Sequence, residues 1–125
     1  MKTTLIFDVE LRGHHLEYLH HLYMGYSTHT DQKYIFVLHK DFLLVKDRLC
    51  WPEYEHIQFD FFEIGINEDF SFVGKIVTSY KLSKLVGKYV KKYNAENVFF
   101  IFLMSFIPWL PFLLPSKVNV SGILY

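Results

Sequence analysis

Residues 3–26 read TTLIFDVELRGHHLEYLHHLYMGY, and this stretch decides the fold that the sequence predicts. Its first seven residues are β-branched or apolar apart from one acid, as in a buried strand, and a break at Arg12–Gly13 follows them. From His14 to Tyr26, leucines and a tyrosine recur at steps of three and four residues, which is typical of one helix face. The stretch therefore predicts a strand, a loop and a helix in succession.

The same alternation continues along the rest of the chain. Further strands are predicted at 34–38, 55–64, 98–102 and 117–125, and further helices at 41–49 and 72–93. The run at 34–38, YIFVL, is uniformly apolar, which favours burial on both faces of a sheet. The pattern predicts an α/β, Rossmann-like domain over residues 1–125, with a mostly parallel sheet of about five strands and helices on both faces.

The long helix predicted at 72–93 combines an apolar stripe with a lysine-rich remainder. The stripe comprises Val73, Ile76, Val77, Tyr80, Leu85, Val86, Tyr89, Val90 and Tyr93. Residues 71–125 carry seven lysines and one acid, whereas residues 1–70 carry six basic and twelve acidic side chains. A basic face of this kind either meets anionic lipid or phosphate or is an ordinary solvated surface. Nucleic-acid binding is not predicted, because the whole chain has zero net charge.

Cysteine usage and the N-terminus bear on the compartment. The one cysteine, Cys50, excludes an internal disulfide and a cysteine-rich zinc site, and it fits a reducing compartment. Beside Trp51 it is expected to be a small buried apolar residue. Between Lys2 and Asp8 the chain holds only three apolar side chains, too few for a secretory signal, which needs about 7–15. A cytoplasmic protein is therefore expected.

The stretch at 98–114, VFFIFLMSFIPWLPFLL, raises the question of a membrane. Its seventeen residues reach only the lower limit for a membrane helix, about 17–25 residues, and Pro108 and Pro111 interrupt them. Its β-branched and aromatic opening instead favours a buried parallel strand. The apolar segment 105–114 would then contact another domain, a second copy of the chain or a membrane surface, with Trp109 at the interface.

The junction between the first strand and the first helix, ELRGHHLEYL, is the candidate site. Ligands of open α/β sheets gather at the carboxyl ends of the strands, and Gly13 lets backbone approach a ligand closely. Arg12, Gly13 and His15 are the candidates for binding phosphate or an acceptor, and His14 and Glu17 for catalysis as proton acceptors. Alternatively, the glycine forms an ordinary turn and the glutamate only favours the helix dipole.

The four histidines of this region do not predict a metal site. His14 is six and seven residues from His20 and His21, and His15 is six residues from His21, which separates these pairs by about 9–10 Å along a helix. A single ion would need further ligands, and the sequence offers no HExxH motif. No metal is therefore expected.

Four segments together resemble the N-terminal domain of GT-B glycosyltransferases, notably the family 4-like bacterial enzymes. They are TTLIFDVE (3–10), RGHHLEYLHHLY (12–23), YIFVLH (34–39) and LPSKVNVSGILY (114–125). The resemblance implies that the loop after the first strand enters a cleft between two Rossmann-like domains. It also implies that Gly13, His14, His15 and Glu17 lie on the acceptor side of that cleft.

The family's second domain, which binds the nucleotide-sugar, has no counterpart in these 125 residues. The resemblance therefore implies an acceptor-side domain that is truncated and inactive by itself and needs no cofactor. Its partners would be a nucleotide-sugar and a sugar or lipid-linked acceptor, with peripheral contact at the inner face of the membrane. The alternatives are a freestanding Rossmann-like binding module, oligomeric through 105–114, and a small membrane-associated protein with 98–114 embedded.

Overall fold

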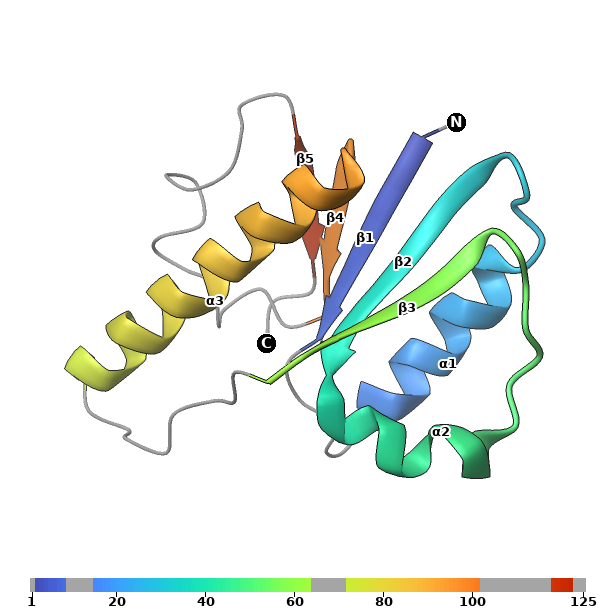
Figure 1. Ribbon diagram of the computed structural model, residues 1–125, viewed down its shortest axis with the longest axis horizontal. Coiled ribbons are helices and arrows are strands. Elements are labelled where there is room, and N and C mark those ends of the chain that lie inside the picture. The colour runs from blue at the N-terminus through green and yellow to red at the C-terminus, as the bar shows by residue number, and fades with distance from the viewer. Residues whose placement is uncertain (1, 9–14, 64–71, 102–117, 123–125) are drawn as a thin grey trace.

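The computed structural model describes residues 2–8, 15–63, 72–101 and 118–122, which form a helix–sheet–helix sandwich (Figure 1). The elements in chain order are β1 (Lys2–Asp8), α1 (His15–Tyr26), β2 (Gln32–His39), the 3-10 helix η1 (Lys40–Phe42), α2 (Leu43–Leu49), β3 (Ile57–Phe62), α3 (Phe72–Tyr93), β4 (Asn97–Phe100) and β5 (Asn119–Gly122). The described strands form one sheet in the order β3-β2-β1-β4-β5, and every neighbouring pair is parallel. The predicted Rossmann-like α/β fold is confirmed.

Helices cover both faces of the sheet, as predicted (Figure 1). On one face, α3 packs Leu82, Val86 and Val90 against residues of β1, β2 and β4. On the other face, α1 contributes Leu19 and Tyr23 to a separate cluster with residues of β1, β2 and β3. Because successive strand residues point to opposite faces, the fully apolar run at 34–38 is buried from both sides.

The elements match their predicted bounds closely, with small differences. Helix α3 has the predicted bounds, and β4 ends at Phe100 because the chain bends at Ile101. The strand predicted at 98–102 is therefore confirmed in its first part. The rest of that stretch and the apolar segment 105–114 lie outside the described residues.

The buried stripe of α3 differs from the predicted one. Val77 and Tyr80 are 42% and 41% exposed, whereas Ser79, Leu82 and Ser83 are almost completely buried. Serine side chains are small, so a helix that presents them to a sheet can approach it closely and leave no unfilled space between the two. The side of α3 that faces the sheet therefore includes Ser79 and Ser83, and it excludes Val77 and Tyr80, which the prediction places there. The lysines that the structure describes on this helix, Lys81, Lys84, Lys88, Lys91 and Lys92, are exposed as predicted.

The prediction that Cys50 is buried is wrong. Cys50 is exposed and caps the end of α2 in the left-handed conformation, with φ 50° and ψ 40°. Its thiol donates to the carbonyl of Asp47 at 3.2 Å instead of entering the core. Left-handed backbone turns the chain sharply after a helix, and the next residue, Trp51, supplies the apolar contact with the core.

Candidate functional site

The strand order creates a switch point at the carboxyl ends of β1 and β4. The connection from β1 to β2 passes through α1 on one face, whereas the connection from β3 to β4 passes through α3 on the other (Figure 1). Phe7 and Phe100 are partners in the register, and the amide of Ile101 donates to the carbonyl of Phe7 at 3.0 Å. In open α/β sheets, ligands bind where neighbouring connections diverge in this way.

Asp8 is the last residue of β1 and lies at this switch point. Asp8 is only 1% exposed, and its register partner in β2 is Leu38. A carboxylate is rarely buried without partners, and Asp8 has polar contacts in the structure. Asp8 was not among the predicted site residues. The signal in the sequence is an acid that directly follows the apolar run at 5–7.

His39 ends β2 at the same edge of the sheet. Its side chain is 15% exposed, and its ring meets Phe62 edge-on at 5.8 Å. Nδ1 accepts the amide N–H of Asp41 at 3.1 Å, so the proton of the neutral ring lies on Nε2. The Asp41 carboxylate lies 3.4 Å from the same nitrogen. This imidazole, which caps η1, was also missed by the sequence prediction, although it directly follows the apolar strand.

The predicted site residues fall mostly outside the described part of the chain. Arg12, Gly13 and His14 lie between β1 and α1, in residues that the structure does not describe. His15 is the first residue of α1, and its side chain is also outside the description. Glu17 is exposed in the first turn of α1. That position suits both a carboxylate beside the switch point and one that only stabilises the helix dipole.

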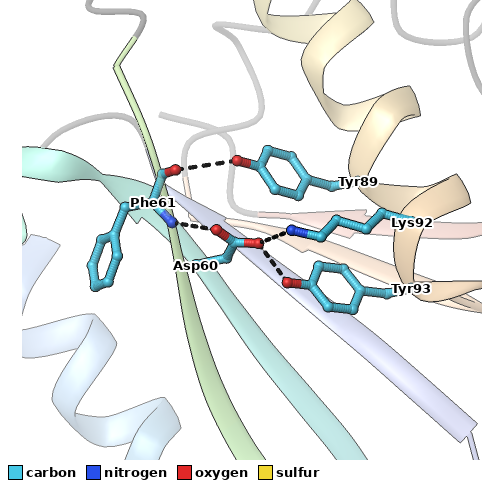
Figure 2. Close-up of polar contacts among 5 residues, drawn as sticks. All are labelled: Asp60, Phe61, Tyr89, Lys92 and Tyr93. Carbon is cyan, nitrogen blue, oxygen red and sulfur yellow. Dashed lines mark hydrogen bonds and ion pairs between the residues drawn. The ribbon is translucent and has the colours of Figure 1, made fainter.

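Asp60 joins the edge strand β3 to α3, as Figure 2 shows. One carboxylate oxygen accepts from the Lys92 ammonium at 2.9 Å and from the Tyr93 hydroxyl, and the other accepts from the Phe61 amide at 2.8 Å. The Tyr89 hydroxyl donates to the Phe61 carbonyl at 3.2 Å. Side-chain bonds therefore occupy both backbone groups of Phe61, which shields this part of the edge strand from pairing with another strand.

Burial and hydrogen bonding act on the pKa of Asp60 in opposite directions. Burial raises the pKa of Asp60, but bonds from Tyr93, Lys92 and the Phe61 amide outweigh it, so the pKa lies below its ordinary value of 3.8. The bond to Asp60 raises the pKa of Lys92 correspondingly. The carboxylate and the ammonium thus both stay charged near neutral pH. The cluster is a structural tie, since all of its polar groups are already engaged with one another.

Metal ligation has no support in the described residues, where no group of three or more His, Cys, Asp or Glu side chains comes together. His20 stacks on Trp51 with ring centroids 5.5 Å apart, and its ring is 6.1 Å from that of His21.

No helix in the described part of the chain combines the length and the apolar character needed to cross a membrane.

The chain has no significant match among protein-family models, curated proteins or solved structures. The fold assignment therefore rests on the elements and strand order of the structure, and the resemblance to GT-B glycosyltransferases stays a prediction.

Proposed function

We propose that this chain is the acceptor-side domain of a glycosyltransferase and that its ligand lies at the carboxyl ends of β1 and β4. The observation that supports this is the strand order, which makes β1 the strand at the switch point. Residues 9–14 follow β1 directly, so Arg12, Gly13 and His14 belong to the connection that leaves this edge. The buried carboxylate of Asp8 and the imidazole of His39 supply further polar groups there.

The proposed chemistry is activation of an acceptor hydroxyl. His14 or Glu17 would take the hydroxyl proton while the acceptor oxygen attacks the anomeric carbon and the nucleoside diphosphate leaves. Arg12, Gly13 and His15 would hold the acceptor or its phosphate through charge and backbone N–H groups. The donor would be bound by a second domain across the cleft. The implied partners are a nucleotide-sugar and a sugar or lipid-linked acceptor, in the cytoplasm at the inner face of the membrane.

Binding of a sugar phosphate to the chain tests the proposal. N-Acetylglucosamine 1-phosphate, added to the ¹⁵N-labelled chain, is expected to shift the amide resonances of Asp8, His39 and Ile101. His14→Ala is expected to weaken binding by about tenfold or more, because it removes a hydrogen bond to a charged group. Its thermal unfolding should match that of the unsubstituted chain, since the proposed role of His14 is to contact the ligand and not to pack in the core.

His29→Ala is the matched control for this experiment. His29 is exposed in the connection between α1 and β2, at the opposite edge of the sheet, so its variant should bind the probe normally. Equal weakening in both variants would contradict the proposed location. Shifts at the same amides with adenosine monophosphate, and none with the sugar phosphate, would instead favour the alternative of a freestanding Rossmann-like binding module without catalysis.

A further inference from the structure

A groove separate from the switch point runs along the edge strand β3, on the face of the sheet that α1 and α2 cover. Its volume is about 560 Å³, within the range of about 300–1,000 Å³ typical of small-molecule sites. Its walls come from α1, α2, the loop at 50–56 and β3. Nothing in the proposed glycosyltransferase chemistry uses this groove.

Aromatic rings form the floor of the groove. Trp51 and Phe59 both stack on Tyr23, with centroid distances of 5.1 and 5.7 Å and interplanar angles of 29° and 24°. The ring of Phe61 is nearly parallel to that of Phe59, and it points away from α3, as Figure 2 shows. The Tyr23 hydroxyl donates to the carbonyl of Pro52, which ties the loop to the floor. The floor is therefore fixed before any ligand arrives.

Polar side chains form the rim of the groove. Asp47 and Glu53 are exposed, so their carboxylate oxygens are available to a ligand. Lys46 is half-buried, with its ammonium 5.0 Å from the centroid of the Phe59 ring. The rim thus combines two carboxylates and one ammonium above an aromatic floor.

The charges on the rim and the position of Lys46 favour a neutral ligand over an anionic or a cationic one. Two carboxylates against one ammonium repel phosphates and other anions. A cationic ligand would have to displace the Lys46 ammonium from its position over Phe59, where the negative face of the ring attracts it. A neutral ligand that packs on the ring of Phe61 meets neither obstacle. It would need an apolar face for the rings and hydroxyl groups for the carboxylates.

We propose that this groove binds the pyranose ring of a neutral saccharide. The C–H face of a pyranose carries partial positive charge and packs on the negative face of an aromatic ring. Its hydroxyls would donate to Asp47 and Glu53, and hydrogen bonds to carboxylates are stronger than those between neutral groups. The groove is independent of the site at β1 and β4, so either proposal stands if the other fails.

The single cysteine of the chain reports directly on the groove. Cys50 is exposed and lines it, so a saccharide bound there would slow alkylation of the thiol by iodoacetamide. In the full chain, glucose, galactose or maltose is expected to slow the reaction in a saturable manner, whereas glucose 1-phosphate and tetramethylammonium are not. Absence of protection by every neutral saccharide would overturn the proposal. So would protection by tetramethylammonium or by an apolar peptide alone.

Variants at the rim and the floor complete the test. Asp47→Asn with Glu53→Gln is expected to weaken saccharide binding by about tenfold, because both charged acceptors are lost. Glu55→Gln is the matched control, since Glu55 is exposed on the same loop but does not line the groove. Phe61→Leu keeps an apolar side chain and removes the ring, so it should also weaken binding. Normal binding in both the double variant and Phe61→Leu would contradict the proposed contacts.

Discussion

The two faces of the sheet are closed in different ways. On the α3 face, one helix of 22 residues covers the strands, mainly with aliphatic side chains such as Leu82, Val86 and Val90. On the opposite face, α1 and the seven-residue α2 leave the side of β3 to a loop, and aromatic rings fill the space. Tyr23 is the centre of that arrangement, with ring contacts to Phe36, Trp51, Tyr54 and Phe59.

Helix length accounts for the difference. A helix of 22 residues extends roughly 33 Å, enough to cross the sheet, whereas seven residues extend only about 10 Å. Where no helix reaches, large planar side chains bury more area per residue than aliphatic ones and can be stacked against one another. Stacked rings do not close the surface completely, and the groove beside β3 remains. One face therefore provides stability alone, and the other combines stability with a surface for a ligand.

A single substitution at the centre of the aromatic face should destabilise the folded chain strongly. Tyr23 is 2% exposed, so Tyr23→Ala is expected to lower the free energy of unfolding by about 4 kcal/mol, measured by urea denaturation. Tyr23→Phe keeps the ring and removes only the bond to Pro52, so its cost should be about 1 kcal/mol. Equal costs for the two variants would show that the stacked rings contribute little.

The aliphatic face should respond to a smaller degree. Leu82 is 1% exposed, and Leu82→Ala is expected to cost about 3 kcal/mol in urea denaturation, because it leaves a cavity under α3. Leu44→Ala is the matched control, since Leu44 is 74% exposed and its loss should change stability by less than about 0.5 kcal/mol. Saccharide protection of Cys50 should survive Leu82→Ala, because the groove lies on the other face. Loss of that protection in folded protein would contradict the independence of the two faces.

The elements could be predicted from the sequence because each leaves a local signal. Periodicity gave the bounds of α3, and the apolar run at 34–38 predicted a strand buried on both faces. The side of α3 that faces the sheet was harder to predict, because Ser79 and Ser83 are polar in the sequence but small enough to be buried. The exposure of Cys50 depends on left-handed backbone at a residue that rarely adopts it, and composition carries no sign of that.

The candidate sites depend on contacts between distant parts of the chain. The switch point exists because β1 pairs with β2 on one side and with β4 on the other, and β4 begins almost ninety residues after β1 ends. Sequence periodicity predicts strands but not their neighbours, so Asp8 and His39 were not connected with the predicted loop. The groove is assembled from four separate segments, and each aromatic residue alone is consistent with an ordinary core position.

The smallest expected effect concerns the tie between the α3 face and the edge strand. Asp60→Asn removes the charge that Lys92 and Tyr93 bind, and it should cost about 1 kcal/mol at neutral pH, because bonds to a charged acceptor are lost at a partly exposed position. The pKa of Asp60 is lowered in the folded chain, so its stabilisation is present above the ordinary carboxyl pKa of 3.8.

That stabilisation should disappear as the pH falls through the lowered pKa of Asp60 in the folded protein, since the carboxylate then takes up a proton and loses its advantage over asparagine. The difference in unfolding free energy between the unsubstituted chain and Asp60→Asn is therefore expected to be constant near neutral pH and to shrink below about pH 4. Asp31→Asn, at an exposed loop position, should show little difference at either pH. A difference for Asp60→Asn that persists unchanged at low pH would mean that the side chain acts through its shape and neutral hydrogen bonds, and that charge contributes little to holding β3 against α3.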